Sequence, residues 1–169
     1  LQITECVDTK SKRLNPANGE YVLKSLEAGI RMSMERDDCA LVTGPIQKNN
    51  MSSCGVPFIG HTEYIEEITK AKNAFMMMSS EHLKVVLATT HIPLKEVAQS
   101  INKELILTVC RSTYKYLENF YHIKHPNIAL LGLNPHAGES GVLGNEEIEI
   151  LAGAISELKS FGIDIAGPI

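Results

Sequence analysis

The sequence predicts an α/β fold in which a mainly parallel sheet is flanked by helices. Short apolar runs, typical of buried strands, alternate along the chain with longer segments whose apolar residues recur every three or four positions, as on one helix face. Parallel strands joined through helices form right-handed crossover units, in which loops carry the function. The composition agrees, because 44% hydrophobic and 21% charged residues in 169 positions are typical of a folded globular domain.

The first part of the chain predicts two helices with a strand between them. Apolar residues at helical spacing predict a helix over 20–36, and the apolar run 39–43 predicts a buried strand that opens into a long loop over 44–60. Acidic residues precede basic ones over 62–72, which suits a helix dipole, and Thr62 is the candidate N-cap.

The second part predicts further strands and helices in alternation. Pro93 is well placed to begin a helix, and Asn145 precedes another. The predicted strands cover 75–78, 83–88 and 127–133, and the predicted helical segments run from 93 to 121 and onward from 145.

Two histidines directly follow predicted strands and are candidate metal ligands. His91 and His136 lie in loops at the carboxyl ends of strands, where an α/β sheet forms its ligand crevice. Converging neutral imidazoles bind divalent metals, but a catalytic ion normally takes three protein ligands, so a third must come from elsewhere. One such histidine alone is more often structural than chemical.

Other polar residues are expected near the same sheet edge. His61 and Thr62 could close the crevice formed by 43–45, 90–91 and 134–136. The remaining histidines are expected on the surface, and these are His82, His122 and His125.

Two weaker signals concern anion binding. The glycines of 138–144 could cradle a phosphate before a helix, but their spacing matches neither known phosphate-loop pattern. Lys48 could reach an anionic substrate, although a loop lysine is usually a solvated charge, and Asn134 is a second candidate of the same rank.

The charge and the apolar runs of the chain argue against two classes of partner, nucleic acids and membranes. The formal net charge is −4 and there is no block of basic residues, so the sequence has no positively charged region that would bind nucleic acid. No apolar run approaches the roughly 20 residues of a membrane helix. We therefore expect no nucleic-acid or membrane partner and a cytoplasmic location.

The cysteines form no C-x-x-C pair, and we expect their thiols to be reduced and mostly buried. A packing role is favoured over a catalytic one even for Cys54, which lies in a loop. The four residues are Cys6, Cys39, Cys54 and Cys110.

Four blocks of sequence in a fixed order resemble the 4-hydroxythreonine-4-phosphate dehydrogenase family of vitamin B6 biosynthesis. The blocks are LVTGPIQK (41–48), GVPFIGHTE (55–63), ATTHIPL (88–94) and GLNPHAGE (132–139). The resemblance spans essentially all of residues 1–169. Because the chain begins at Leu1 and stops within an apparent strand and turn, we expect it to be the central part of a two-domain α/β dehydrogenase, with stretches absent on both sides.

The resemblance implies a fold similar to that of isocitrate and isopropylmalate dehydrogenases and a homodimer whose active site lies between subunits. It implies oxidation of 4-phosphooxy-L-threonine by NAD, with NADP as the alternative, and with one divalent ion (zinc, magnesium or cobalt). The ion would favour the substrate alkoxide, and the resulting β-keto acid would lose carbon dioxide to give 3-amino-2-oxopropyl phosphate.

The family pattern also implies residue roles. His91 and His136 would be metal ligands, His61 and Thr62 would contact the substrate, and a third histidine ligand would follow Ile169 and come from the partner subunit. The chain departs from the pattern at Gln47, where many relatives have histidine, and at Asn49, where they have glycine.

The sequence alone is compatible with other functions. Within the family, relatives act on 4-phospho-threonate or 4-phospho-erythronate, which lack the amine. From other classes, an acyl or phosphate transferase would need phosphate and coenzyme A pockets but no histidine-bound metal, and a non-catalytic binding domain would need neither.

Overall fold

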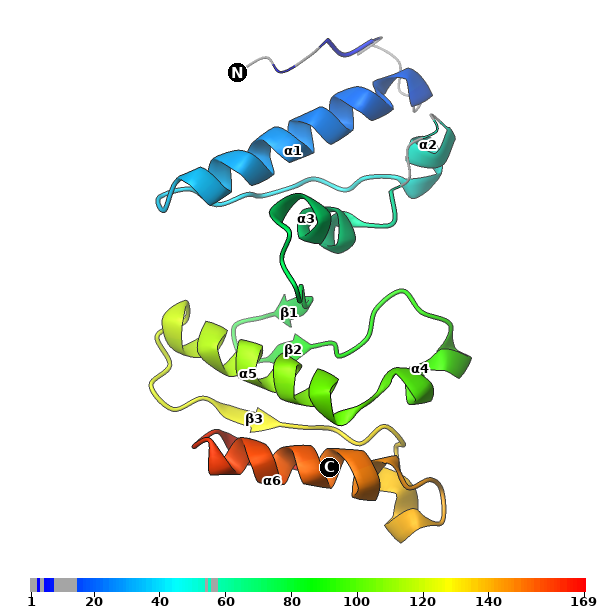
Figure 1. Ribbon diagram of the computed structural model, residues 1–169. Helices are drawn as coiled ribbons and strands as arrows, with labels where there is room; N and C mark the ends of the chain where they lie inside the picture. The colour runs from blue at the N-terminus through cyan, green and yellow to red at the C-terminus, as the bar shows by residue number, and fades with distance from the viewer. Residues whose placement is uncertain (1–2, 4, 8–14, 54, 56–57) are drawn as a thin grey trace. The chain divides into compact units, whose positions relative to one another are not determined.

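The computed structural model describes residues 3, 5–7, 15–53, 55 and 58–169 (Figure 1). The chain divides into two compact units, residues 1–74 and residues 75–169. Helices and strands both occur among the described residues, so the chain has a mixed helix-and-strand fold. Within these residues no helix combines the length and the apolar composition needed to cross a lipid bilayer.

The first unit is helical where the structure describes it. A 3-10 turn (Pro16–Asn18) leads directly into α1 (Gly19–Glu35), which matches the helix predicted over 20–36. Two shorter helices follow, α2 (Lys48–Ser53) and α3 (His61–Thr69).

The core of the first unit joins all three helices. Leu26 and Ile30 on α1 pack with Met51 on α2 and with Phe58, which lies just before α3. These buried side chains fix α1 against the segment that leads into His61, the first residue of α3.

Two predictions for the first unit are wrong. Residues 39–43 form no strand, and Val42 is 92% exposed rather than buried. A strand requires a hydrogen-bonded partner, and none of the described residues of this unit forms a strand that could pair with it. The N-cap of α3 is Gly60 in extended conformation, so Thr62 is the second residue of the helix instead of its cap.

The second unit contains two two-stranded sheets. Strands β1 (Met77–Ser79) and β2 (Lys84–Val86) form an antiparallel hairpin. Strands β3 (Asn127–Ala129) and β4 (Asp164–Ala166) pair in parallel, with Ile128 opposite Ile165.

The described residues therefore do not form the single, mainly parallel sheet that the sequence predicted. The connection between β1 and β2 is only residues 80–83, and so short a loop can join antiparallel strands but not the ends of parallel ones. The expected strand–helix–strand arrangement is found once, where the chain passes from β3 through a helix to β4.

The long helical segment predicted over 93–121 is two helices. Helix α4 (Leu94–Ser100) ends at Ile101, and α5 (Lys103–Asn119) begins after Asn102. The Asn102 side-chain oxygen accepts the backbone N–H of Leu105 at 2.9 Å, which caps α5 and explains the break.

The last helix begins irregularly. A 3-10 turn (Ala137–Gly141) is followed by a π-helical turn (Glu147–Leu151) and then by α6 (Ala152–Ser160). The wider π turn changes the helical register, so Leu151 is buried in the core whereas Ile148, three residues earlier, is 56% exposed.

The core of the second unit lies among α5, α6 and the β3–β4 pair. In Figure 1, β3 runs between α5 and α6. Cys110 on α5 packs in one cluster with Leu158 on α6 and Ile165 on β4. Ala88 and Leu133 also pack against this cluster, so the segments that lead to His91 and His136 are anchored on the core.

Candidate functional site

A cavity of about 310 Å³ in the first unit joins residues that the sequence singled out. Its wall is formed by α1, by the extended segment 41–46 and by His61 at the start of α3. The predicted meeting of the loop 43–45 with His61 is therefore found within this unit. Tyr21, Ser25 and Thr43 bring hydroxyl groups to the same cavity.

His61 has a buried nitrogen without a partner. Its ring meets that of Phe58 edge-on, with centroids 5.7 Å apart and planes at 84°. The Nε2 atom is inaccessible to solvent, and no described residue forms a hydrogen bond with it. A buried polar atom left without a hydrogen bond costs about 1–3 kcal/mol. Such atoms are rare in folded proteins, and a bound ligand is one group that can satisfy them.

The other two predicted binding residues of this unit lie outside the cavity wall. Thr62 is half-buried on α3, and Lys48 is exposed as the first residue of α2. Neither is among the described residues that line the cavity.

His91 lies in the second unit, after β2 and before α4. The preceding Thr89 and Thr90 are half-buried, and His91 itself is exposed. Its backbone has a φ of 56°, in the left-handed region that few residues other than glycine enter. This turn ends the extended segment and directs the chain toward Pro93, the N-cap of α4.

His136 lies in the loop after β3, and its side chain is 66% exposed. Its Nδ1 lies 3.5 Å from Oε1 of Glu139. Its backbone N–H donates to the side-chain oxygen of Asn134 at 2.8 Å. A carboxylate next to Nδ1 orients an imidazole so that Nε2 faces outward, which is the usual arrangement of a metal-binding histidine.

A buried carboxylate that the sequence analysis missed supports this loop. Glu147 is only 3% exposed, and its Oε1 accepts the backbone N–H of Asn134 at 2.9 Å. The carboxylate also lies beside Gly138, because a Cβ atom on that glycine would stand 2.9 Å from Oε2 of Glu147. A phosphate within this loop would be repelled by that charge, which weighs against a phosphate cradle at 138–144.

The residues that the structure describes do not assemble a complete metal site. Within the described residues no group of three or more His, Cys, Asp or Glu side chains is arranged to hold a metal ion. The two candidate imidazoles of the second unit suit a divalent cation chemically, but they form at most part of a ligand set.

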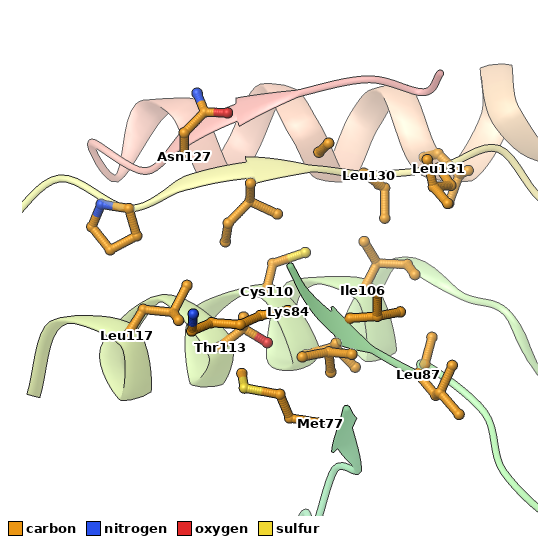
Figure 2. A pocket seen from close by; sticks show the side chains of 18 of the residues that line it. Met77, Lys84, Leu87, Ile106, Cys110, Thr113, Leu117, Asn127, Leu130 and Leu131 are labelled. Atoms are coloured by element: carbon orange, nitrogen blue, oxygen red, sulfur yellow. The ribbon is translucent and has the colours of Figure 1, made fainter. Parts of the chain in front are cut away.

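The second unit also contains an apolar cavity of about 690 Å³ (Figure 2). Ile106, Cys110 and Leu117 of α5 line it, together with residues of β2 and β3. Thr89 and Leu133 belong to its wall, but His91 and His136 do not. Its largely aliphatic wall is unsuited to a phosphorylated substrate.

The remaining histidines and cysteines have ordinary environments. His82, His122 and His125 are exposed, as predicted. The described cysteines are free thiols, but only Cys110 is buried, whereas Cys39 is half-buried and Cys6 exposed. Burial raises the pKa of the Cys110 thiol to about 11, so this thiol is unreactive near neutral pH. Cys54 lies outside the described residues.

Comparison with known proteins gives a consistent result. The sequence profile of the family described as pyridoxal phosphate biosynthetic protein PdxA matches residues 1–169. The 4-hydroxythreonine-4-phosphate dehydrogenase of Chromobacterium violaceum is 42% identical over 169 residues, which is all of this chain and 52% of that protein. The enzyme of the same name from Colwellia psychrerythraea is 43% identical over 156 residues, covering 92% of this chain and 48% of that one.

A solved structure is also similar. The crystal structure of 4-hydroxythreonine-4-phosphate dehydrogenase from Klebsiella pneumoniae matches with a TM-score of 0.81 and 31% identity, over 92% of this chain and 47% of that one. The chain thus spans about half the length of the relatives it matches.

Proposed function

The chain belongs to the family of the pyridoxal phosphate biosynthetic protein PdxA, and from this premise we propose that it supplies part of the active site of an NAD-dependent dehydrogenase. The proposed substrate is 4-phosphooxy-L-threonine. Oxidation transfers a hydride from the carbinol carbon to NAD and releases the hydroxyl proton. The β-keto acid then loses carbon dioxide and gives 3-amino-2-oxopropyl phosphate in vitamin B6 biosynthesis. We place the reaction in the cytoplasm.

The observation that carries this proposal is the family match over residues 1–169, together with His61, which lines a cavity and has an unsatisfied Nε2. We propose that His61 and Thr62 bind the substrate. Nε2 is not accessible from the cavity in this conformation, so binding requires the ring to turn toward the substrate. A hydrogen bond to a polar substrate group would then remove the cost of leaving this atom buried without a partner. The cavity wall adds hydroxyl groups that suit a polar, phosphorylated acid.

We further propose that His91 and His136 bind the divalent ion of the reaction. Both side chains are exposed on loops of the second unit, and the Glu139 carboxylate lies next to Nδ1 of His136. A third imidazole, expected beyond Ile169 and from the partner subunit of a homodimer, would complete the set. When bound, the ion supplies Lewis-acid polarisation of the substrate hydroxyl.

The finer fold assignment is part of the same proposal. We propose the architecture of the isocitrate and isopropylmalate dehydrogenases, with a mainly parallel sheet, for the whole enzyme of which this chain supplies part. The parallel pair β3–β4, connected through α6, supports it.

A chimera tests the proposed reaction. This chain would replace the matched 52% of the Chromobacterium violaceum enzyme. NADH formation is then measured with 4-phosphooxy-L-threonine, 4-phospho-threonate and 4-phospho-erythronate in parallel. We expect the highest kcat/KM with the first acid, in the presence of zinc, magnesium or cobalt.

Two controls make the result interpretable. Circular dichroism and gel filtration establish that the chimera folds as the parent enzyme does. Calorimetric binding of the three acids to the 169-residue chain gives an independent measurement. A folded chimera without NADH formation, or one that prefers an acid lacking the amine, would contradict the proposed substrate.

A further inference from the structure

The loop that carries His136 has an unfavourable backbone conformation. Four consecutive residues, 137–140, have left-handed φ values between 44° and 74°, and only Gly138 among them is a glycine. Each of the other three costs about 1 kcal/mol or more in this conformation. Such a turn persists only where surrounding groups hold it in place.

Glu147 is positioned to hold this turn. One carboxylate oxygen accepts the Asn134 N–H at 2.9 Å, and the other lies beside Gly138, where a Cβ atom would come within 2.9 Å. The structure gives Glu147 no cationic partner within the described part of the chain. The buried carboxylate therefore contacts the loop both before and within the strained turn.

The contact extends from Glu147 to His136 through Asn134. The Asn134 backbone donates to Glu147, and the Asn134 side-chain oxygen accepts the His136 N–H at 2.8 Å. We propose that Glu147 is a positioning residue that sets the backbone of His136 through Asn134. The inference rests on the proposed function for the role of His136 but not for the contacts themselves.

The location of Glu147 explains why a carboxylate can be buried there. It is the first residue of the helical segment that continues into α6, and the positive end of a helix dipole favours a negative charge. The helix start therefore stabilises the charge, and the loop uses the carboxylate oxygens as hydrogen-bond acceptors.

Three variants of the 169-residue chain separate the hydrogen bond from the charge. Glu147→Ala removes the acceptor, whereas Glu147→Gln keeps a side-chain carbonyl oxygen at the same distance from the backbone. Glu149→Ala is the matched control. This substitution removes an equal charge from the same turn, but the side chain of Glu149 is exposed.

Amide hydrogen exchange measured by NMR reads out the first step. In Glu147→Ala we expect the Asn134 amide to exchange at least about tenfold faster, while the amides of α5 keep their protection. Glu147→Gln should restore most of the protection, and Glu149→Ala should not change it.

Zinc binding reads out the second step, and it is measured by calorimetry with the same variants in the chimera with the Chromobacterium violaceum enzyme, which supplies the third histidine expected beyond Ile169. Loss of a group that orients a metal-binding histidine typically weakens metal affinity by about 10- to 100-fold. We expect this loss in Glu147→Ala but not in Glu149→Ala, with Glu147→Gln close to the unmodified chimera.

The outcomes distinguish this inference from the proposed function. Unchanged Asn134 exchange in Glu147→Ala would overturn the inference, as would equally faster exchange throughout α5 and α6, which indicates general destabilisation. Unchanged zinc affinity in Glu147→Ala despite faster Asn134 exchange would also overturn it. If the unmodified chimera binds no zinc but Asn134 responds as expected, the positioning of the loop is supported and the proposed metal ligands are contradicted.

Discussion

The backbone N–H of Asn134 donates a 2.9 Å hydrogen bond to the buried carboxylate of Glu147, which lies 13 residues further along the chain. This bond ties the loop after β3 to the start of the helical segment that leads into α6. The position of His136 therefore depends on a residue outside the motif that contains it.

Substitution of Gly138 by alanine tests how tightly this loop is packed. Gly138 is buried with a φ of 74°, and a Cβ atom there would lie 2.8 Å from the carbonyl oxygen of Gly144. Because the clash is with backbone and the conformation is left-handed, we expect Gly138→Ala to lower the free energy of unfolding by about 2–3 kcal/mol. Urea denaturation of the 169-residue chain measures the change.

Gly153→Ala is the matched control for this experiment. Gly153 lies within α6, and a Cβ atom there would meet no atom within 4 Å. Alanine has the higher helix propensity, so this variant should be more stable by about 0.5–1 kcal/mol. Equal effects of the two substitutions would contradict the packing described for Gly138.

The burial of Cys110 predicts a pH dependence of stability. The pKa of its thiol is raised from 9.0 to about 11 in the folded chain, so the unfolded state loses this proton first as the pH rises. The unfolded state then binds fewer protons than the folded state, and the free energy of unfolding falls between about pH 9 and pH 11. Urea denaturation across this range measures the slope.

Cys110→Ala separates this thiol from other groups that titrate in the same range. The decline of stability with pH should be shallower in the variant, since the ionisable group is absent. Parallel pH profiles for the unmodified chain and for Cys110→Ala would refute the assignment of this slope to the Cys110 thiol.

Alkylation tests the same burial. In the unmodified chain, exposed Cys6 should be alkylated before buried Cys110, as mass spectrometry of the peptides can establish.

His61→Phe should change stability and binding in opposite directions. Phenylalanine keeps an aromatic ring against Phe58 and removes the buried Nε2 that has no partner. We expect the free energy of unfolding to rise by about 1 kcal/mol and the affinity for 4-phosphooxy-L-threonine to fall at least about tenfold. Denaturation and calorimetry measure the two effects.

The control for this variant is His125→Phe, because His125 is exposed. It should change neither stability nor affinity appreciably. If His61→Phe destabilised the chain and left substrate binding intact, the histidine would have a structural role.

The sequence predicted the helices better than the strands. The apolar spacing over 20–36 corresponds to α1, because that helix buries Leu26 and Ile30 along one face. The apolar run 39–43 looked equally regular, yet it has no strand partner among the described residues, and pairing depends on distant parts of a chain.

For the candidate site as well, the sequence revealed local motifs but not contacts between residues far apart in the chain. Strand-end histidines and the Gly60-His61-Thr62 motif could be recognised locally, and His61 indeed lines a cavity with the loop 43–45. Glu147 could not be recognised as buried, since a glutamate at the start of a helix is normally solvated. Its partner Asn134 becomes its neighbour only through the fold.

The central claim is that His91 and His136 bind the ion that the dehydrogenase reaction requires. Its most direct test is the kcat/KM for NADH formation by the chimera with 4-phosphooxy-L-threonine, comparing His91→Ala and His136→Ala with His125→Ala. We predict a fall of at least about a hundredfold for each of the first two variants and no appreciable change for the third. Undiminished turnover in His91→Ala and His136→Ala would contradict the account.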